Sequence, residues 1–338
     1  MNSDKTNFLL SCFNHYDLHI VGIAETHLVG DNIIDVDGYA WYGSNRKHIH
    51  VRAKSGSGGV GFLIRNDVCK LFNIDIVDDD TDGILWVKLE DKTCPRNTFF
   101  VCVIYLPPEN SSRAVNVCDF FETLMAKIYT IPQGSAFYLC GDWNSRCSDF
   151  PDYIAGVDNL PERYVVDFNH NSYGSLFCDF LTDVNCCILN GRKTVHNDYT
   201  FISSRGSSVV DYCVIPYETL DSFDNFNVIR TSVLIENTTA LGNYDLNRII
   251  PDHSLLTWDL TLSFQCDIPT ENVRKSSRGC TTKTKYDFRN IPNDWLCSES
   301  AISEITRMIE CLENSEATQC NLDIMYDQFI NTFKTEMA

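Results

Sequence analysis

Long apolar runs are absent from this sequence. No stretch reaches the roughly 18 consecutive apolar residues that indicate a transmembrane helix. The first residues, Met1 to Lys5, also lack the basic and then apolar pattern of a secretory signal. We therefore expect an intracellular protein with no membrane partner.

Cys-x-x-Cys pairs are absent as well. The chain has 16 cysteines, and none of them forms the Cys-x-x-Cys spacing of zinc ribbons and thioredoxin-like redox sites. Many stand in apolar runs, where a free cysteine behaves as a small buried hydrophobe. A disulfide framework is rare in a reducing cell, so we expect free and mostly buried thiols at Cys69, Cys102, Cys140, Cys186, Cys187 and Cys213.

Basic residues are few, because 27 Lys and Arg stand against 46 Asp and Glu, for a net charge of -19. Tight non-specific binding of nucleic acid depends on Lys and Arg contacts to phosphates, so the composition argues against that class of protein. It does not exclude an enzyme that meets nucleic acid at one metal-loaded surface, since a bound cation supplies local positive charge.

The chain does contain an alternation of short apolar runs and longer helical patterns, which indicates a layered α/β architecture. Runs rich in Val, Ile, Phe and Tyr predict strands at His19–Ala24, Gly59–Ile64, Ile84–Leu89, Phe99–Tyr105, Ala136–Cys140, Tyr199–Ile202, Val209–Ile215 and Ser254–Leu262. Apolar residues at helical spacing predict helices at Lys5–His15, Arg113–Tyr129, Ser172–Val184 and near Ile302–Leu312.

A change in composition follows the last expected strand. Residues 266–285 are polar and basic and show no periodicity, which is typical of a linker. We therefore expect one domain over residues 1–265, and a linker with a helical tail over residues 266–338.

Two polar residues follow one apolar run, in the motif Gly-Asp-Trp-Asn at residues 141–144. On an extended segment, side chains two residues apart leave by the same face, so Asp142 and Asn144 would act together. A carboxylate there can take a proton from water, and an amide can donate to a phosphate oxygen. The same residue types also form ordinary turns, and the motif alone leaves both interpretations open.

An acidic residue, Asp211, interrupts another apolar run. A buried carboxylate needs a partner, and a histidine is a natural one, because the carboxylate fixes its tautomer and orientation. The pair Asp252 and His253, just before the last expected strand, can share a metal ion or a phosphate. Alternatively, Asp211 lies on the polar face of a half-buried strand, and the Asp-His pair is a surface turn.

Two further strand ends carry candidate residues. Glu25 ends the first apolar run, and the carboxyl edge of an α/β sheet is where ligands bind; its oxygens suit Mg²⁺. Tyr105 closes another strand before Pro107 and Pro108, and its hydroxyl can donate to a phosphate. Each has an ordinary alternative, since Glu25 also fits a helix-capping or surface position and Tyr105 an amphipathic strand end.

The order of these motifs is more specific than any one of them. Glu at a strand end, then Tyr-x-Pro-Pro, Gly-Asp-x-Asn, Ser-x-x-Asp and Asp-His resembles the endonuclease/exonuclease/phosphatase superfamily, over about residues 5–262. The motifs at residues 58–62, 189–192, 199–201 and 208–212 look like the endonuclease domain of non-LTR retrotransposon polyproteins. Tyr-Asp-Phe at 286–288 and Ile-Pro at 291–292 resemble the connector that follows that domain before a reverse transcriptase.

The resemblance implies a four-layer α/β sandwich, in which two packed mixed β-sheets are flanked by helices. It also implies a Mg²⁺-dependent phosphodiesterase, a DNA endonuclease of retrotransposon type, with Mn²⁺ as the alternative ion. DNA would be the substrate, a reverse transcriptase or another retrotransposon-encoded protein the partner, and the nucleus the place of action.

By the matched positions, the resemblance also assigns the metal and the water. Glu25 and Asp252 would hold the ion, and Asp252 would also assist the leaving group. Asp142 would orient and deprotonate the attacking water. This division of roles is chemically reasonable, because the charge on the phosphoryl oxygens must be neutralised while the attacking water is oriented.

The remaining matched residues would contact the phosphate. Asp211 would orient His253, and His253 would contact the scissile phosphoryl oxygen. Asn144 would brace the phosphate, and Tyr105 would donate a hydrogen bond to it. Several groups must act together in this way, because a phosphodiester resists water strongly.

Two departures from the family pattern affect these expectations. The family begins with a strand whose Asn helps hold the metal-linked Glu, whereas this chain starts at about the following helix, and neither Asn2 nor Asn7 is placed to substitute. Pro251 stands where the family has Ser before Asp-His. We therefore expect the N-terminal strand to be missing, and we hypothesise lower stability and activity than in an intact domain.

Two other functions stay open at this point. A phosphatase of the same superfamily, acting on inositol phosphate or lipid, would share Gly-Asp-x-Asn-x-Arg, although its usual Trp-Cys-Asp-Arg signature is absent around Asp211. A catalytically inactive remnant that serves as a binding module would fit a missing strand. The complete set of candidate residues argues against a remnant, because a decaying site loses residues.

Overall fold

The computed structural model describes residues 3–46, 58–132, 134–239, 251–262, 298–314 and 328–329. The chain divides into two compact units, Met1–Asp267 and Ile268–Ala338. The expected linker at residues 266–285 and the connector motifs at 286–288 and 291–292 lie outside the described residues. In the second unit, the helix expected near Ile302 is confirmed as α6 (Glu299–Asn314).

A six-stranded sheet forms the centre of the first unit, with the strand order β4-β5-β6-β7-β12-β8. Strands β6 and β7 run parallel and the other neighbours run antiparallel, so the sheet is mixed. Its strands are β4 (Phe72–Asp78), β5 (Ile84–Asp91), β6 (Thr98–Tyr105), β7 (Phe137–Asp142), β8 (Cys186–Ile188) and β12 (Asp211–Pro216).

Two three-stranded sheets, ordered β1-β3-β2 and β14-β13-β9, form the adjoining layer in the described part of this unit. Their apolar side chains share one buried cluster with the six-stranded sheet. Their strands are β1 (Ile20–Ala24), β2 (Tyr39–Ser44), β3 (Val60–Arg65), β9 (Thr194–His196), β13 (Phe223–Ile229) and β14 (Leu255–Leu260).

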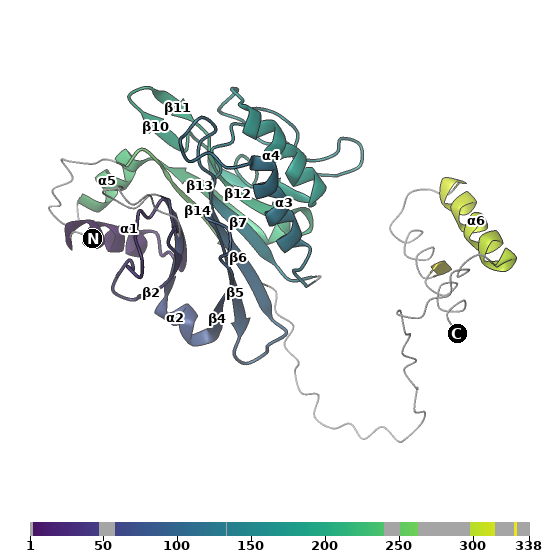
Figure 1. Cartoon of the computed structure of the whole chain (residues 1–338), viewed down its shortest axis with the longest axis horizontal. Coiled ribbons are helices and arrows are strands. Elements are labelled where there is room, and N and C mark those ends of the chain that lie inside the picture. The colour runs from purple at the N-terminus through teal and green to yellow at the C-terminus, as the bar shows by residue number, and fades with distance from the viewer. Residues whose placement is uncertain are drawn as a thin grey trace, which may run out of the picture. The chain divides into compact units, whose positions relative to one another are not determined.

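Side chains alternate between the two faces of the six-stranded sheet, as the strand period of two requires. On β6, Phe100 and Cys102 pack on the side of the helices α3 (Val117–Ile128) and α4 (Ser172–Asp183). Val101 packs on the side of the smaller sheets. Figure 1 shows α3 and α4 together on one face of the sheet. Because both faces are covered, the central strands are nearly continuous apolar runs.

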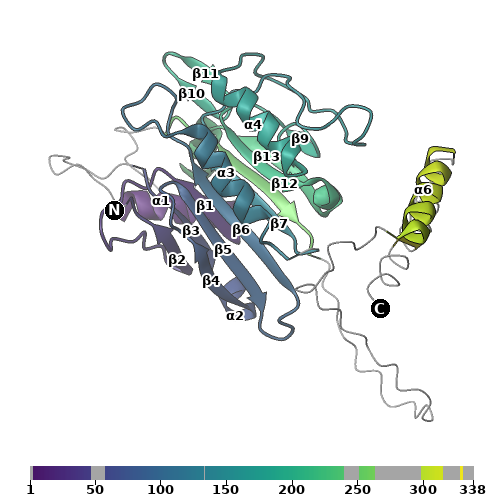
Figure 2. The ribbon, with the colours of Figure 1, turned by 45° about the vertical axis from the view of Figure 1, so that its right-hand side comes forward.

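Helices α1 (Ser3–His15) and α5 (Thr231–Thr239) form the outer layer on the other side. Phe13 of α1 and Leu234 of α5 belong to one buried cluster with Val21 of β1 and Leu63 of β3. The layers therefore run helices, sheet, sheets, helices, as Figures 1 and 2 show. This order confirms the predicted four-layer α/β sandwich.

Some boundaries differ from those the sequence predicted. The helix expected from Arg113 begins at Val117, because the side chain of Asn116 accepts from the Cys118 amide at 3.1 Å and caps it. The short elements that the apolar patterns did not predict are α2 (Asn66–Leu71), β2, β4, β8, β9, β11 (Gly206–Ser208), β13, α5 and a 3-10 helix at Tyr217–Ser222. None of the described helices is both long and apolar enough to cross a bilayer.

Candidate active site

The carboxylate of Asp142 belongs to the last residue of β7, rather than to the loop that we expected after a strand ending at Cys140. Asp142 pairs with Tyr105 of the parallel β6 and with Asp211 of the antiparallel β12. One residue earlier, Gly141 has a φ of +137°, and a Cβ there would overlap the backbone oxygen of Ile104. Only glycine suits this conformation and close approach, so Gly141 fixes how β7 delivers Asp142.

Asn144 follows β7 with a φ of +46°, so the expected extended segment is not present there. Its backbone amide and side-chain amide donate to the two carboxylate oxygens of Asp142 at 3.0 and 2.9 Å. The side-chain amide also donates to the carbonyl of Leu106 at 2.8 Å. The amide that was expected at a phosphate therefore holds the Asp142 carboxylate in this structure.

His253 and Asp211 form a hydrogen-bonded pair from two different segments. His253 Nδ1 lies 3.0 and 2.9 Å from the two carboxylate oxygens of Asp211. The ring of Phe201 in β10 (Phe201–Ser203) meets the imidazole edge-on, with 5.0 Å between centroids. Thr200 links both segments, because its hydroxyl accepts from the Asp211 amide at 3.0 Å and its carbonyl from the Ser254 amide at 2.7 Å.

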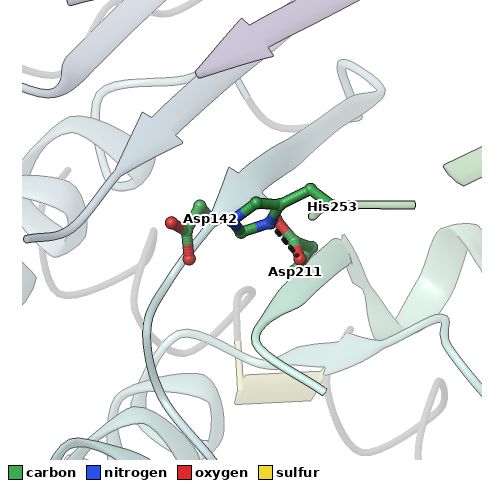
Figure 3. A group of neighbouring side chains, drawn as sticks. All are labelled: Asp142, Asp211 and His253. Atoms are coloured by element: carbon green, nitrogen blue, oxygen red, sulfur yellow. Dashed lines mark hydrogen bonds and ion pairs between the residues drawn. The ribbon is translucent and has the colours of Figure 1, made fainter. Parts of the chain in front are cut away.

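Asp142, Asp211 and His253 lie close enough together to share one ion. One ligand atom from each lies within 4.8 Å of the others, and among the described residues this is the one such group of three acidic, His or Cys side chains. Figure 3 shows the imidazole between the two carboxylates, with its bond to Asp211 drawn. Asp142 is buried, and the other two are half-buried. The fold thus assembles three predicted residues from distant parts of the sequence.

Burial and crowded charge set the protonation of this group. Burial, followed by the charge of Asp211, raises the pKa of the Asp142 carboxyl well above its usual range. Burial alone would lower the pKa of His253, but its bond to Asp211 and the charges of Asp142 and Glu25 raise that pKa to about 9. His253 is therefore an imidazolium at neutral pH, while a cation bound beside Asp142 would favour the ionised carboxylate.

Glu25 borders this group through Tyr105 and Arg113. The Tyr105 hydroxyl donates to the Glu25 carboxylate, and burial together with that carboxylate raises the pKa of Tyr105, so the phenol keeps its proton. Arg113 Nη1 lies 3.5 Å from the same carboxylate. Glu25 has a φ of +51°, a conformation that non-glycine residues adopt rarely and often at functional sites.

The donors present suit a hard divalent cation. Mg²⁺ prefers carboxylate oxygens, which Asp142, Asp211 and Glu25 provide, and two adjacent carboxylates in a partly buried site are stabilised by a cation. Asp252 is exposed and lies outside the group of three. Its carbonyl accepts from the Ile202 amide at 2.8 Å, so its backbone positions His253, and its expected role as a metal ligand stays a prediction.

Polar residues that the motifs did not single out hold the loop after β7. The Asn171 side chain donates to the Asn144 carbonyl at 2.9 Å and accepts from the Arg146 amide at 2.9 Å. The Arg146 guanidinium donates to Asp167 at 2.9 and 2.7 Å, and Asp167 accepts from the Val209 amide at 3.0 Å. This chain of bonds connects the loop after Asp142 to the segment before Asp211. Of these polar residues, only Arg146 belongs to a motif noted in the sequence, Gly-Asp-x-Asn-x-Arg.

Comparison with known families matches residues 2–218 to the Endonuclease/Exonuclease/phosphatase family. The matched range contains Glu25, Asp142 and Asp211 and ends before His253. No curated protein matches the sequence.

Solved structures share this fold, among them the following two. The endonuclease domain of TRAS1, a telomere-specific non-LTR retrotransposon, has 14% identity and a TM-score of 0.53, over 78% of this chain and 95% of that one. The AP endonuclease LMAP from Leishmania major has 14% identity and a TM-score of 0.52, over 75% of this chain and 82% of that one. At these identities the likeness shows a shared fold.

Proposed function

Because the chain belongs to the Endonuclease/Exonuclease/phosphatase family, we propose that it is a divalent-metal-dependent DNA endonuclease of the non-LTR retrotransposon type. The observation that carries the proposal is the group of Asp142, Asp211 and His253, whose ligand atoms lie within 4.8 Å of one another. The choice of an endonuclease draws on the likeness to the TRAS1 domain and on the sequence motifs at residues 189–192 and 199–201. A partner reverse transcriptase and a nuclear place of action belong to the same proposal.

A cation would be held by the carboxylates of Glu25 and Asp142. When bound, Mg²⁺ or Mn²⁺ would polarise the phosphoryl group and neutralise its charge. Tyr105, which keeps its proton, would donate to a phosphate oxygen once the Glu25 carboxylate turns to the ion. Arg113, 3.5 Å from Glu25, would then offer its charge to the DNA backbone.

His253 would act as the hydrogen-bond donor to the scissile phosphoryl oxygen. Its Nδ1 is bonded to Asp211, so Nε2 is the ring atom that would donate. The carboxylate fixes the ring and maintains its positive charge, which raises the pKa of His253 to about 9. The imidazolium would already stand beside the phosphoryl oxygen on which negative charge develops. It would therefore lower the activation barrier without a rearrangement during the reaction.

Asp142 would orient the attacking water and accept its proton. Its carboxylate is held at both oxygens by Asn144, so its direction is fixed before substrate binds. Burial raises the pKa of Asp142, which makes the carboxylate a stronger base than an exposed one. A base held in this way supplies both orientation and proton transfer.

The test is a panel of substrates given to the full chain with Mg²⁺, with Mn²⁺ and with a chelator. The panel contains supercoiled plasmid, a duplex with one abasic site, and an inositol polyphosphate. The proposal predicts metal-dependent nicking of the plasmid. Cleavage confined to the abasic duplex would change the substrate class, release of phosphate from the inositol would favour the phosphatase, and no cleavage by folded protein would favour a binding module.

Matched variants connect that activity to the site. Asp142→Asn and His253→Ala should each abolish most nicking. Glu122→Gln on the exposed face of α3 and His15→Ala at the end of α1 remove the same kinds of groups away from the site, and they should nick as the wild type does. Loss of nicking in the controls as well would indicate a folding defect rather than a catalytic one.

A further inference from the structure

Two cysteines that the proposed reaction does not use lie in contact. The described cysteines are free thiols, and those expected to be buried are so, except for the half-buried Cys69. Among them, Cys147 in the loop after β7 and Cys178 on α4 interact with each other. Cys178 Sγ lies 3.9 Å from the Phe150 carbonyl oxygen, and Arg163 reaches from that oxygen, at 2.7 Å, to Cys147 Sγ, at 3.7 Å. Both are buried, yet they come from different elements, so their contact is made by the tertiary fold.

A cation stands beside one of the two thiols. Arg163 Nη1 lies 3.7 Å from Cys147 Sγ, and the guanidinium is anchored by a bond to the Phe150 carbonyl at 2.7 Å. The Cys147 thiol donates to the Tyr212 hydroxyl at 3.2 Å, and that hydroxyl donates its own proton to the Val209 carbonyl at 2.8 Å. The Cys178 thiol also donates to the Phe150 carbonyl at 3.9 Å, so the charge of Arg163 is the fixed group that stabilises a thiolate once Cys147 loses its proton.

The two thiols differ in acidity as a result. The hydrogen bond from Cys178, followed by the charge of Arg163, holds the pKa of Cys147 below its usual range despite burial. The bond to Cys147, together with burial, raises the pKa of Cys178. A thiolate next to a protonated thiol is the arrangement in which one cysteine attacks an oxidant and the other resolves the product.

A small cavity reaches the first of these thiols. It has a volume of about 20 Å³, and its lining includes Cys147, Arg163, Tyr212 and Asn197. The side-chain oxygen of Asn197 has no hydrogen-bond partner among the described residues, so it can accept from a small polar guest. A volume of this size admits a water-sized molecule, and hydrogen peroxide is only slightly larger.

We propose that Cys147 and Cys178 form a peroxide-sensitive pair, in which hydrogen peroxide oxidises Cys147 and Cys178 then closes a disulfide. The Cys147 thiolate attacks one peroxide oxygen, the O–O bond breaks, and the leaving hydroxide takes a proton to become water. The Cys178 sulfur attacks the sulfenic acid, the S–S bond forms, the S–O bond breaks, and the proton of Cys178 leaves with the hydroxyl as a second water. Two thiols are oxidised and one peroxide is reduced.

The pair lies where a disulfide would fix the loop that follows the candidate base. Cys147 comes directly after Arg146, and the start of α4 packs on this backbone so closely that a Cβ at Gly174 would overlap the Arg146 carbonyl. A bridge to Cys178 would fasten the loop to α4 by a covalent bond. It would also remove the thiolate from Arg163, whose remaining ionic partner is Asp152 at 3.7 Å.

The test oxidises the reduced full chain with hydrogen peroxide and maps its cysteines by mass spectrometry, so it does not depend on nuclease activity. The protein is alkylated under denaturing conditions and digested with trypsin, which cuts after Arg163 and separates the two cysteines. We expect a linked pair of peptides that dithiothreitol separates, and fragmentation that places the bridge at Cys178 rather than at Cys186 or Cys187.

Variants distinguish this pair from general oxidation. In Cys178→Ala, the sulfenic acid at Cys147 should persist and be trapped by dimedone, because the resolving thiol is gone. Cys118→Ala, which removes an exposed thiol on α3, should leave the link unchanged. The proposal is overturned if the wild type, shown by circular dichroism to be folded, yields alkylated Cys147 after peroxide while Cys118 is oxidised, or if the link joins Cys147 to another residue.

Discussion

Asp142 and Asp211 lie directly opposite each other on the antiparallel strands β7 and β12. Burial and the charge of Asp211 together raise the pKa of the Asp142 carboxyl, so Asp142 stabilises the folded state less at neutral pH than at acid pH. A divalent cation would reverse this effect. The relationship therefore links stability, metal binding and the proposed reaction at one pair of residues.

The first prediction concerns Asp142→Asn. A carboxyl whose pKa is raised by folding stabilises the fold while it is protonated, and this contribution is lost as pH rises through the folded pKa. At neutral pH without metal, the variant should therefore melt at the wild-type temperature or above. Mg²⁺ should raise the melting temperature of the wild type and not that of the variant, because a ligand stabilises the state that binds it.

Calorimetric scans at several Mg²⁺ concentrations check this result, with Glu122→Gln as the matched control. The control should keep the full Mg²⁺ response, since Glu122 is exposed on α3. An equal Mg²⁺ response in Asp142→Asn and the wild type would show that the ion binds elsewhere.

The second prediction concerns the pH dependence of nicking. His253 has a pKa of about 9 because of Asp211, so the rate should fall as pH rises through about 9, where the imidazolium loses its proton. In Asp211→Asn the pKa of His253 drops, and this fall should move to lower pH. His253→Ala should remove it and lower the rate by about 10²–10⁴-fold. Nicking rates measured from pH 6 to 10 test this prediction. If the rate of Asp211→Asn falls at the same alkaline pH as that of the wild type, the role assigned to His253 is contradicted.

The third prediction concerns Gly141→Ala. The variant carries the cost of a strained backbone, about 1–3 kcal/mol, and a further 1–3 kcal/mol or so from overlap with Ile104. Gly206→Ala is the control, because Gly206 has a φ of +144°, close to that of Gly141, but no atom within 4 Å of the added Cβ. Denaturant unfolding should show a clearly larger decrease in the free energy of unfolding for Gly141→Ala than for Gly206→Ala. Equal losses would mean that the approach of β7 to β6 does not require glycine.

The fourth prediction concerns the buried pair of Asp152 and Arg192, the arginine of the Leu-Asn-Gly-Arg motif. Arg192 donates twice to Asp152 at 2.8 Å, and both side chains are almost wholly buried. Asp152→Asn should lower the free energy of unfolding by about 3–5 kcal/mol, because it leaves the Arg192 guanidinium without its counter-charge. Asp179→Asn on the exposed side of α4 should cost little.

The same pair has a defined pH dependence. Burial opposes ionisation of Asp152, but the bonds from Arg192 outweigh it and lower the pKa below 3.8. The advantage of the wild type over Asp152→Asn should therefore be full above pH 3.8 and fall as pH drops through the folded pKa. Unfolding free energies at pH 3 to 7 test this, and an advantage that grows on acidification would contradict it.

The sequence predicted the layers and the core residues of the site because both leave strong local patterns. Strands such as β6, buried on both faces, stand out as apolar runs, and α3 and α4 show helical spacing. Asp142 and Asp211 interrupt such runs at strand ends, which made them visible. Their meeting with His253 could be expected only from the resemblance, since it depends on tertiary structure.

Other features left no such signal. Strands β8, β9 and β11 have three residues each, too short to show a period of two. Arg113 was placed in a helix, because nothing local shows that Asn116 rather than an earlier residue begins it. The bonds of Asn171 and Asp167 join loops distant in sequence, and such contacts arise only in the folded chain.

The most direct test of the central claim is the rate of plasmid nicking as Mg²⁺ is varied, for the wild type, Asp142→Asn and Glu122→Gln in parallel. We expect nicking that requires Mg²⁺ and saturates with it in the wild type and in Glu122→Gln, and a loss of about 10²-fold or more in Asp142→Asn. Nicking that persists in a chelator, or that survives in Asp142→Asn, would contradict a metal-dependent nuclease site at Asp142, Asp211 and His253.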